Sequence, residues 1–241
     1  MTKRSARIER LPAADWPSAI EAAYVAFEGY PSPRVALEVS SARENGEQMF
    51  ADLTSAPLRE LSYDKLTAFE GSALYTAGSL SDYKHFLPRL LELMVSAAGE
   101  AFYANIAAHK LNYAHFTTRP QDEVTAVRDV FRYALAAGFS VPPGAILISS
   151  LLEGNAAVGN ALEPVLAGLR FDTAVALRNL AELVGDVVGR GIGRLSDADR
   201  QVLEAWVRSP AVAEALVNGI DLVAPDDLHE IENALFIVRV V

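Results

Sequence analysis

Cysteine is absent from the 241-residue sequence. This absence excludes disulfide bonds, thiolate metal sites and cysteine nucleophiles together. A metal ion would therefore have to bind histidine, aspartate or glutamate side chains.

Long hydrophobic runs are also missing. The basic start Met1–Arg4 is not followed by a continuous apolar segment, so we expect no secretory signal. The most apolar region, residues 134–159, is interrupted by Pro142, Pro143 and Glu153 and does not qualify as a membrane span. The sequence predicts a soluble cytoplasmic protein that does not enter a membrane.

Positive charge is in deficit, because 21 lysines and arginines face 31 aspartates and glutamates, for a formal net charge of −10. Such a surface repels a polyanion unless a local basic patch reverses the field. The basic residues Arg59, Lys65, Lys84 and Arg89 are scattered rather than clustered. We therefore expect no non-specific binding to nucleic acid.

Strict alternation of apolar and polar residues is nearly missing, whereas apolar residues recur often at spacings of three and four. This pattern predicts an all-α protein, with residues 1–241 forming one domain as an orthogonal bundle or a short irregular helical-repeat stack. About ten helices are expected, beginning near residues 15, 49, 62, 87, 102, 120, 172, 196, 212 and 225. The β-branched end, residues 236–241, also suits a strand, but the helical pattern is preferred.

The short segment 140–144, after the sixth of these helices, cannot continue a helix. A helix that starts near Pro120 should stop at Gly138, and the following segment contains Pro142, Pro143 and Gly144. We predict a hinge or subdomain boundary within 138–144.

The stretch Ser81–Leu93 places aromatic, charged, imidazole and proline residues ahead of a leucine run. Proline costs nothing in the first turn of a helix, so Pro88 predicts a helix start near Leu87. Residues 82–86 would then form a tight turn or a short 3₁₀ entry. The side chains left exposed at the helix mouth, as a predicted binding surface, are those of Tyr83, Lys84, His85 and Arg89.

Three elements of the first hundred residues resemble a bacterial family of uncharacterised helical proteins. The elements are Tyr30-Pro31-Ser32-Pro33, Ala56-Pro57-Leu58-Arg59-Glu60-Leu61 (with Ala73, Thr76 and Gly78 after it) and Asp82-Tyr83-Lys84-His85-Phe86-Leu87-Pro88-Arg89-Leu90-Leu91-Glu92-Leu93. Members of that family often carry cysteines shortly after the Tyr-Pro element, where this chain has residues 39–43 without cysteine. The resemblance implies a helical fold and supplies no activity.

The sequence contains two carboxylate-x-x-histidine pairs, Asp82 with His85 and Asp226 with His229, which suggest a metal site as an alternative to a purely structural role. Such pairs on facing helices can build a dinuclear metal site, although these sites usually use glutamate and need further carboxylates. An accidental spacing among many acidic residues is the preferred interpretation, so no metal is expected.

A second alternative is catalytic. His85, oriented by Asp82, would act as a general acid or base together with His109 and His115. The preferred interpretation is a histidine that bonds locally, and no catalytic residue or cofactor is expected. His109, Tyr113 and His115 also share an aromatic stripe with Phe102, Tyr103 and Phe116, and this stripe is interpreted as core rather than as the lining of a ligand cavity.

The glycine-rich segment 189–194 looks like a phosphate loop, but a helix precedes it where a dinucleotide site needs a strand. A helix end followed by a linker is preferred there. The leading hypothesis for function is a non-enzymatic protein that binds another protein, as an adaptor, regulator or immunity-type partner. A metal-dependent or small-molecule enzyme and a structural subunit of a larger assembly stay open, as does a homo-oligomer.

Overall fold

The computed structural model describes residues 15–40, 45–95, 103–189 and 191–240. Within these ranges the chain forms twelve α-helices and four short 3₁₀ helices, with two isolated β-bridges and no strand. The all-α prediction is confirmed.

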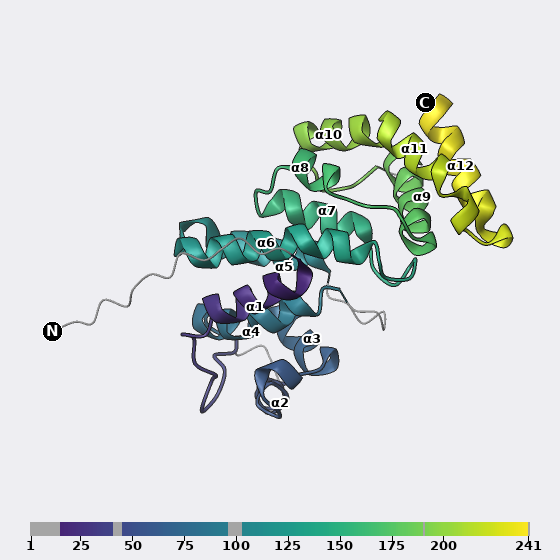
Figure 1. The fold of residues 1–241 in the computed structure, drawn as a ribbon. Coiled ribbons are helices and arrows are strands. Elements are labelled where there is room, and N and C mark those ends of the chain that lie inside the picture. The colour runs from purple at the N-terminus through teal and green to yellow at the C-terminus, as the bar shows by residue number, and fades with distance from the viewer. Residues whose placement is uncertain (1–14, 41–44, 96–102, 190, 241) are drawn as a thin grey trace.

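The helices form two lobes with α5, α6 and α7 between them (Figure 1). The first part of the chain comprises α1 (Trp16–Ala26), α2 (Gly46–Leu53), η1 (Leu58–Glu60), α3 (Tyr63–Ser72), α4 (Leu80–Glu92), α5 (Ala104–Tyr113), η2 (Phe116–Thr118) and α6 (Gln121–Gly138). The second comprises α7 (Ile148–Ala157), α8 (Leu162–Ala167), α9 (Ala174–Gly189), α10 (Asp197–Val207), α11 (Pro210–Asn218), η3 (Ile220–Leu222), η4 (Pro225–Asp227) and α12 (Leu228–Val240). Helix α6 packs against both α1 and α7, and α9 packs against α12.

Helix starts follow the capping residues that the sequence displays. The Asp15 carboxylate accepts the backbone N–H of Ser18 at 2.9 Å at the start of α1. The Ser196 hydroxyl accepts the N–H of Asp199 at the start of α10. Helix α9 begins at Ala174, close to the expected start near residue 172, and its cap is the Thr173 hydroxyl, which accepts the N–H of Ala176 at 3.1 Å. These contacts satisfy N–H groups that have no partner inside the helix.

The predicted start of α4 near Leu87 is wrong. The helix begins at Leu80, capped by Ser79, and Pro88 lies inside it. Proline in a helix interior removes one backbone hydrogen bond. Two features stabilise α4 despite this loss. Ser79 and Asp82 form a cap at its start, and the leucines that follow are buried.

Two short helices, α7 and α8, have no counterpart in the sequence-based prediction. Every residue of α7 from Ser150 to Asn155 is buried. A helix that is buried around its circumference shows no apolar stripe, which is the feature on which the prediction depends.

The connection between α6 and α7 is fastened to α9. The side-chain amide of Asn179 donates to the carbonyl oxygens of Phe139 and Val141, at 3.0 and 2.8 Å. Buried hydrophobic residues of both lobes belong to one contiguous cluster. The boundary in 138–144 stays a prediction.

Two further expectations concern the end of the chain and the membrane. Residues 228–240 form α12, so the helical alternative for the C-terminus is confirmed as far as Val240. Among the residues that the structure describes, no helix combines the length and the apolar character needed to cross a bilayer.

Two glycines should respond to alanine with opposite signs. A methyl group on Gly219 would lie 2.2 Å from Cδ1 of the buried Leu177, whereas one on Gly185 would meet no atom within 4 Å. We expect Gly219→Ala to lower the free energy of unfolding by about 1–3 kcal/mol. Gly185→Ala, inside α9, should raise it by about 0.5–1 kcal/mol. Urea denaturation measures both, and a destabilised Gly185→Ala variant would contradict the packing of α9.

Candidate functional site

The predicted binding surface on α4 is largely buried. The exposed fraction is 1% for Tyr83 and 6% for Lys84, while His85 and Arg89 are partly buried. Because the helix starts before these residues, their side chains point from a continuous helix into its neighbours. The expectation of four side chains exposed at a helix mouth is therefore wrong.

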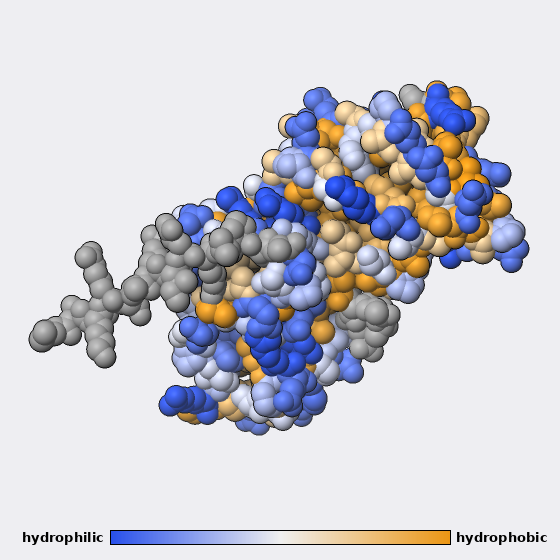
Figure 2. Space-filling view, viewed as in Figure 1, coloured by the Kyte–Doolittle hydropathy of each residue, from blue (hydrophilic) through white to orange (hydrophobic). Residues whose placement is uncertain are grey.

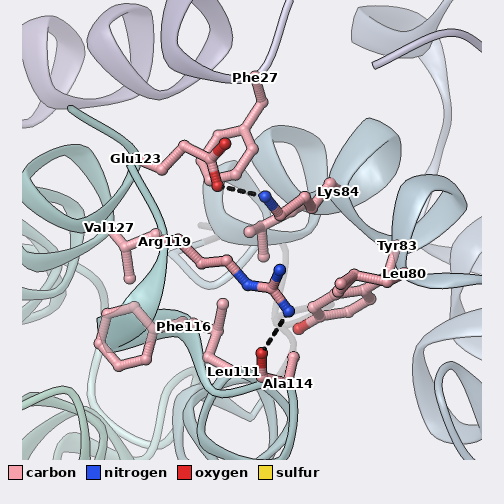
Figure 3. Close-up of a pocket in the computed structure, with 11 residues that line it drawn as sticks. Phe27, Leu80, Tyr83, Lys84, Leu111, Ala114, Phe116, Arg119, Glu123 and Val127 are labelled. Atoms are coloured by element: carbon pink, nitrogen blue, oxygen red, sulfur yellow. Dashed lines mark hydrogen bonds and ion pairs between the residues drawn. The ribbon is translucent and has the colours of Figure 1, made fainter. Parts of the chain in front are cut away.

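Lys84 lies at the centre of a buried polar cluster. Its Nζ donates to Oε2 of Glu123 and to the hydroxyl of Tyr30, both at 2.5 Å. The Tyr30 hydroxyl in turn donates to Oε1 of Glu123 at 2.6 Å. Figure 3 shows the Lys84 and Glu123 side chains meeting between α4 and α6. The cluster thus joins α4, α6 and the segment after α1.

His85 and Arg89 also hold distant segments against α4. The Nδ1 atom of His85 lies 2.8 Å from the carbonyl oxygen of Tyr30. The Nε atom of Arg89 donates to the carbonyl oxygen of Leu61 at 2.8 Å, and its Nη1 donates to Glu92 at 2.7 Å. These contacts are structural, because each side chain satisfies a backbone or charged group within the fold.

The two carboxylate-x-x-histidine pairs are not brought together, because Asp82 and His85 lie on α4 whereas Asp226 and His229 lie in η4 and α12. The Asp82 carboxylate accepts from the backbone and the hydroxyl of Ser79, and no hydrogen bond joins it to His85. His229 makes a local contact with the carbonyl oxygen of Asp226, on the opposite lobe from α4 (Figure 1). Within the described ranges, no three histidine, aspartate or glutamate side chains are grouped to hold a metal ion.

The other two histidines of the catalytic alternative belong to α5 and to the turn after it. His109 is half-buried on α5, and His115 is exposed in the turn after it, with a φ of 52°. The pairing of Asp82 with His85 that this alternative requires is not present.

The polar atoms that lack partners gather on another side of α4. Among the described residues, the buried side-chain atoms without a hydrogen bond are Oε1 of Glu70, the hydroxyl of Tyr83 and Nε of Arg119. Burial raises the pKa of Tyr83, and the nearby Glu70 carboxylate and Tyr75 raise it further. An unpartnered buried polar atom is costly, which makes this region unlike the satisfied cluster around Lys84.

A pair of exposed tyrosines lies above these atoms. The rings of Tyr75 and Tyr113 meet edge to face with centroids 5.2 Å apart, and the residues are 55% and 59% exposed. Beneath them Lys110 is 1% exposed, with its Nζ 4.8 Å from the Tyr75 ring centroid and hydrogen-bonded to the carbonyl oxygen of Ala73. The Tyr75 ring of the pair thus contacts a buried cation, the ammonium group of Lys110.

The backbone is strained on both sides of this pair. In the described parts of the chain, Leu74 (φ 66°) and His115 (φ 52°) are the non-glycine residues with a positive φ. This conformation costs on the order of 1–2 kcal/mol for a residue with a side chain. Leu74 immediately precedes Tyr75, and His115 follows Tyr113 by two residues, so both strained positions lie next to the tyrosine pair along the chain.

The exposed side of α5 extends the pair into a larger surface. Ile106, His109 and Tyr113 recur at spacings of three and four, and Ile106 and Tyr103 are 38% and 52% exposed. We define the α5 surface as Tyr75, Tyr103, Ile106 and Tyr113. The interpretation of the aromatic stripe as core is thus wrong for Tyr103 and Tyr113 but right for the buried Phe116, and Phe102 lies outside the described residues.

Tyr75 was missed by the sequence reasoning. It lies in the turn between α3 and α4, 38 positions before its partner Tyr113, and no periodic pattern relates the two. The available signal is Gly78, whose φ of 72° marks the tight turn that carries Tyr75.

The buried ion pair should be sensitive to the loss of either partner. Glu123→Gln leaves the Lys84 charge buried without its counter-ion, so we expect the free energy of unfolding to fall by about 3–5 kcal/mol. The exposed pair of Arg59 and Glu21 is the control, and Glu21→Gln should cost less than about 1 kcal/mol. Replacing Lys84 by Met and Glu123 by Leu together should cost less than the sum of the single changes. Additive losses would contradict direct coupling of the two charges.

Glu70 should destabilise the fold at neutral pH. Burial raises the pKa of its carboxyl group above the ordinary 4.5, although Lys110 partly offsets this. The folded state therefore binds this proton more tightly than the unfolded state does. The protonated carboxyl group makes its whole contribution to the free energy of unfolding below pH 4.5, and this contribution is lost as the pH rises through the raised pKa. Glu70→Gln should be more stable than the natural protein at pH 7, and the difference should vanish in acid. Urea denaturation across that range tests this, and a gain independent of pH would contradict it.

No protein-family model, curated protein or solved structure matches this chain. The family resemblance of the first hundred residues therefore stays a prediction. Function has to be argued from the geometry of the α5 surface and of the atoms beneath it.

Proposed function

We propose that the protein acts by binding another protein through the α5 surface. The observation that carries this proposal is the exposed pair of Tyr75 and Tyr113, held between two strained backbone positions, Leu74 and His115. Strained residues persist only where the surrounding structure fixes them, and they gather at sites of recognition or catalysis.

The shape of the surface favours a protein over a small molecule. Tyr103 and Tyr113 are ten residues apart at the two ends of α5, which corresponds to about 15 Å along the helix. Tyrosine is enriched in protein interfaces because it offers a large apolar ring with a polar tip. The opposite side of α5 is buried through Ala104, Ala108 and Leu111, so the surface is presented on a rigid support.

Net charge indicates what kind of partner is expected. With a formal charge of −10, the chain attracts a basic protein over a distance and repels an acidic one. The proposed partner is therefore a basic protein whose interface contains apolar or aromatic side chains. This supports the adaptor, regulator or immunity-type role expected from the sequence.

A second candidate function, a subunit of a larger assembly, is favoured by the opposite lobe. Figure 2 shows hydrophobic residues gathered over the part of the molecule that contains α9 and α12. Phe236 and Val240, on α12, are 65% and 63% exposed. Exposed apolar groups of this kind are typical of contact surfaces when they are contiguous. Native mass measurement distinguishes a stable oligomer from a monomer.

The α5 surface is tested by alanine substitution of its tyrosines. A partner isolated with the natural protein should bind Tyr75→Ala and Tyr113→Ala at least tenfold more weakly, since a central tyrosine in an interface contributes about 2 kcal/mol or more. Phe236→Ala is the matched control, because it removes an equally exposed ring from the other lobe. The association rate should also fall as salt is raised.

Two results would contradict this proposal. One is undiminished affinity of both tyrosine variants when their thermal midpoints show that they are folded. The other is an equal loss for Phe236→Ala, which would favour the assembly surface on α12 instead.

A further inference from the structure

A small cavity lies between α1, α4, α5 and α6, below the α5 surface. Its volume is about 10 Å³, which leaves room for one particle the size of a water molecule. Most of its lining is apolar, and the polar groups that border it are those of Tyr83, Lys84, Arg119 and Glu123 (Figure 3).

Two of these polar groups have no hydrogen-bond partner among the residues that the structure describes. The hydroxyl of Tyr83, whose residue is 1% exposed, forms no hydrogen bond, and neither does the buried Nε of Arg119. Arg119 is held by a single contact, from Nη2 to the carbonyl oxygen of Ala114 at 2.8 Å. In Figure 3 its guanidinium group lies beside the Tyr83 hydroxyl, so two unused donors border the same cavity.

The charges around the cavity do not cancel. Lys84 and Glu123 neutralise each other, and both Glu123 oxygens are already engaged, by Lys84 and by Tyr30. Arg119 forms no ion pair with a carboxylate within the described residues. The lining therefore carries one positive charge without a carboxylate partner. The Arg119 side chain is partly exposed, but its Nε atom is buried, and a buried charged donor without a hydrogen bond is unfavourable.

We propose that the cavity binds one chloride ion, held by the Nε–H group of Arg119 and the hydroxyl of Tyr83. A monatomic anion accepts hydrogen bonds from both donors, balances the guanidinium charge and needs less space than a carboxylate or a phosphate. The negative charge of the Glu70 carboxylate, near Tyr83, opposes the binding of an anion, and the positive charge of Lys110 partly offsets this repulsion. Chloride should therefore bind more tightly when Glu70 is protonated or replaced by glutamine.

The ion is tested by thermal denaturation in chloride and in gluconate at equal ionic strength. For the natural protein, the midpoint should rise steadily with chloride concentration and stay flat in gluconate, since a ligand of the folded state stabilises it by mass action. Tyr83→Phe removes one hydrogen bond to a charged group, so its chloride affinity should fall roughly tenfold to a hundredfold. In gluconate the same variant should be at least as stable as the natural protein, because it lacks a buried hydroxyl without a partner.

Arg119→Met should lose the response to chloride, and the exposed Arg34 provides the matched control, since Arg34→Met changes the net charge equally in the same lobe. If Arg119→Met does not fold, Tyr83→Phe decides the question. Crystals grown in sodium bromide should show an anomalous peak within hydrogen-bonding distance of Tyr83 and Arg119. An ordered water without an anomalous peak, or equal responses of Tyr83→Phe and the natural protein, would overturn the proposal. Both readouts are independent of whether the α5 surface binds a protein.

Discussion

The buried interaction of Lys84 with Glu123 and Tyr30 is the constraint on which the first lobe depends. Two charges are taken out of water between α4 and α6, and this is tolerable only because every polar atom of the group has a partner. The requirement fixes the rotation of α4, because Lys84 must face α6. Once α4 is fixed, His85 and Arg89 point to the carbonyl oxygens of Tyr30 and Leu61.

These contacts give a physical meaning to the three sequence elements of the first hundred residues. Tyr30 belongs to the first element, Leu61 to the second, and Lys84, His85 and Arg89 to the third, and the hydrogen bonds run from the third to the other two. A pattern of charged, aromatic and imidazole residues that suggests a reactive site is thus used to join distant segments. Lys84, His85 and Arg89, which look reactive in the sequence, have their polar atoms occupied by contacts within the fold.

The sequence predicts what depends on local rules. Ten of the twelve helices follow from apolar spacing, and the caps at Asp15 and Ser196 follow from side chains that bind the next turn. The buried helix α7 has no stripe, and the proline of α4 is outweighed by packing that no local rule contains. The contact of Tyr75 with Tyr113 depends on how α5 packs beside the turn after α3, so the α5 surface could not be predicted from spacing.

The two sides of α4 therefore differ in whether their polar groups have partners. Toward Tyr30 and Glu123, polar groups are paired and close the fold. Toward α5, the Tyr83 hydroxyl, Arg119 Nε and Glu70 Oε1 lack partners, and the backbone is strained at Leu74 and His115. Each such feature costs stability, and their coincidence in one region is not required by the packing of the helices. Contacts with a ligand or a partner protein can offset the cost of backbone strain and of donors without partners. We therefore expect recognition in this region, where exposed aromatic rings are also present.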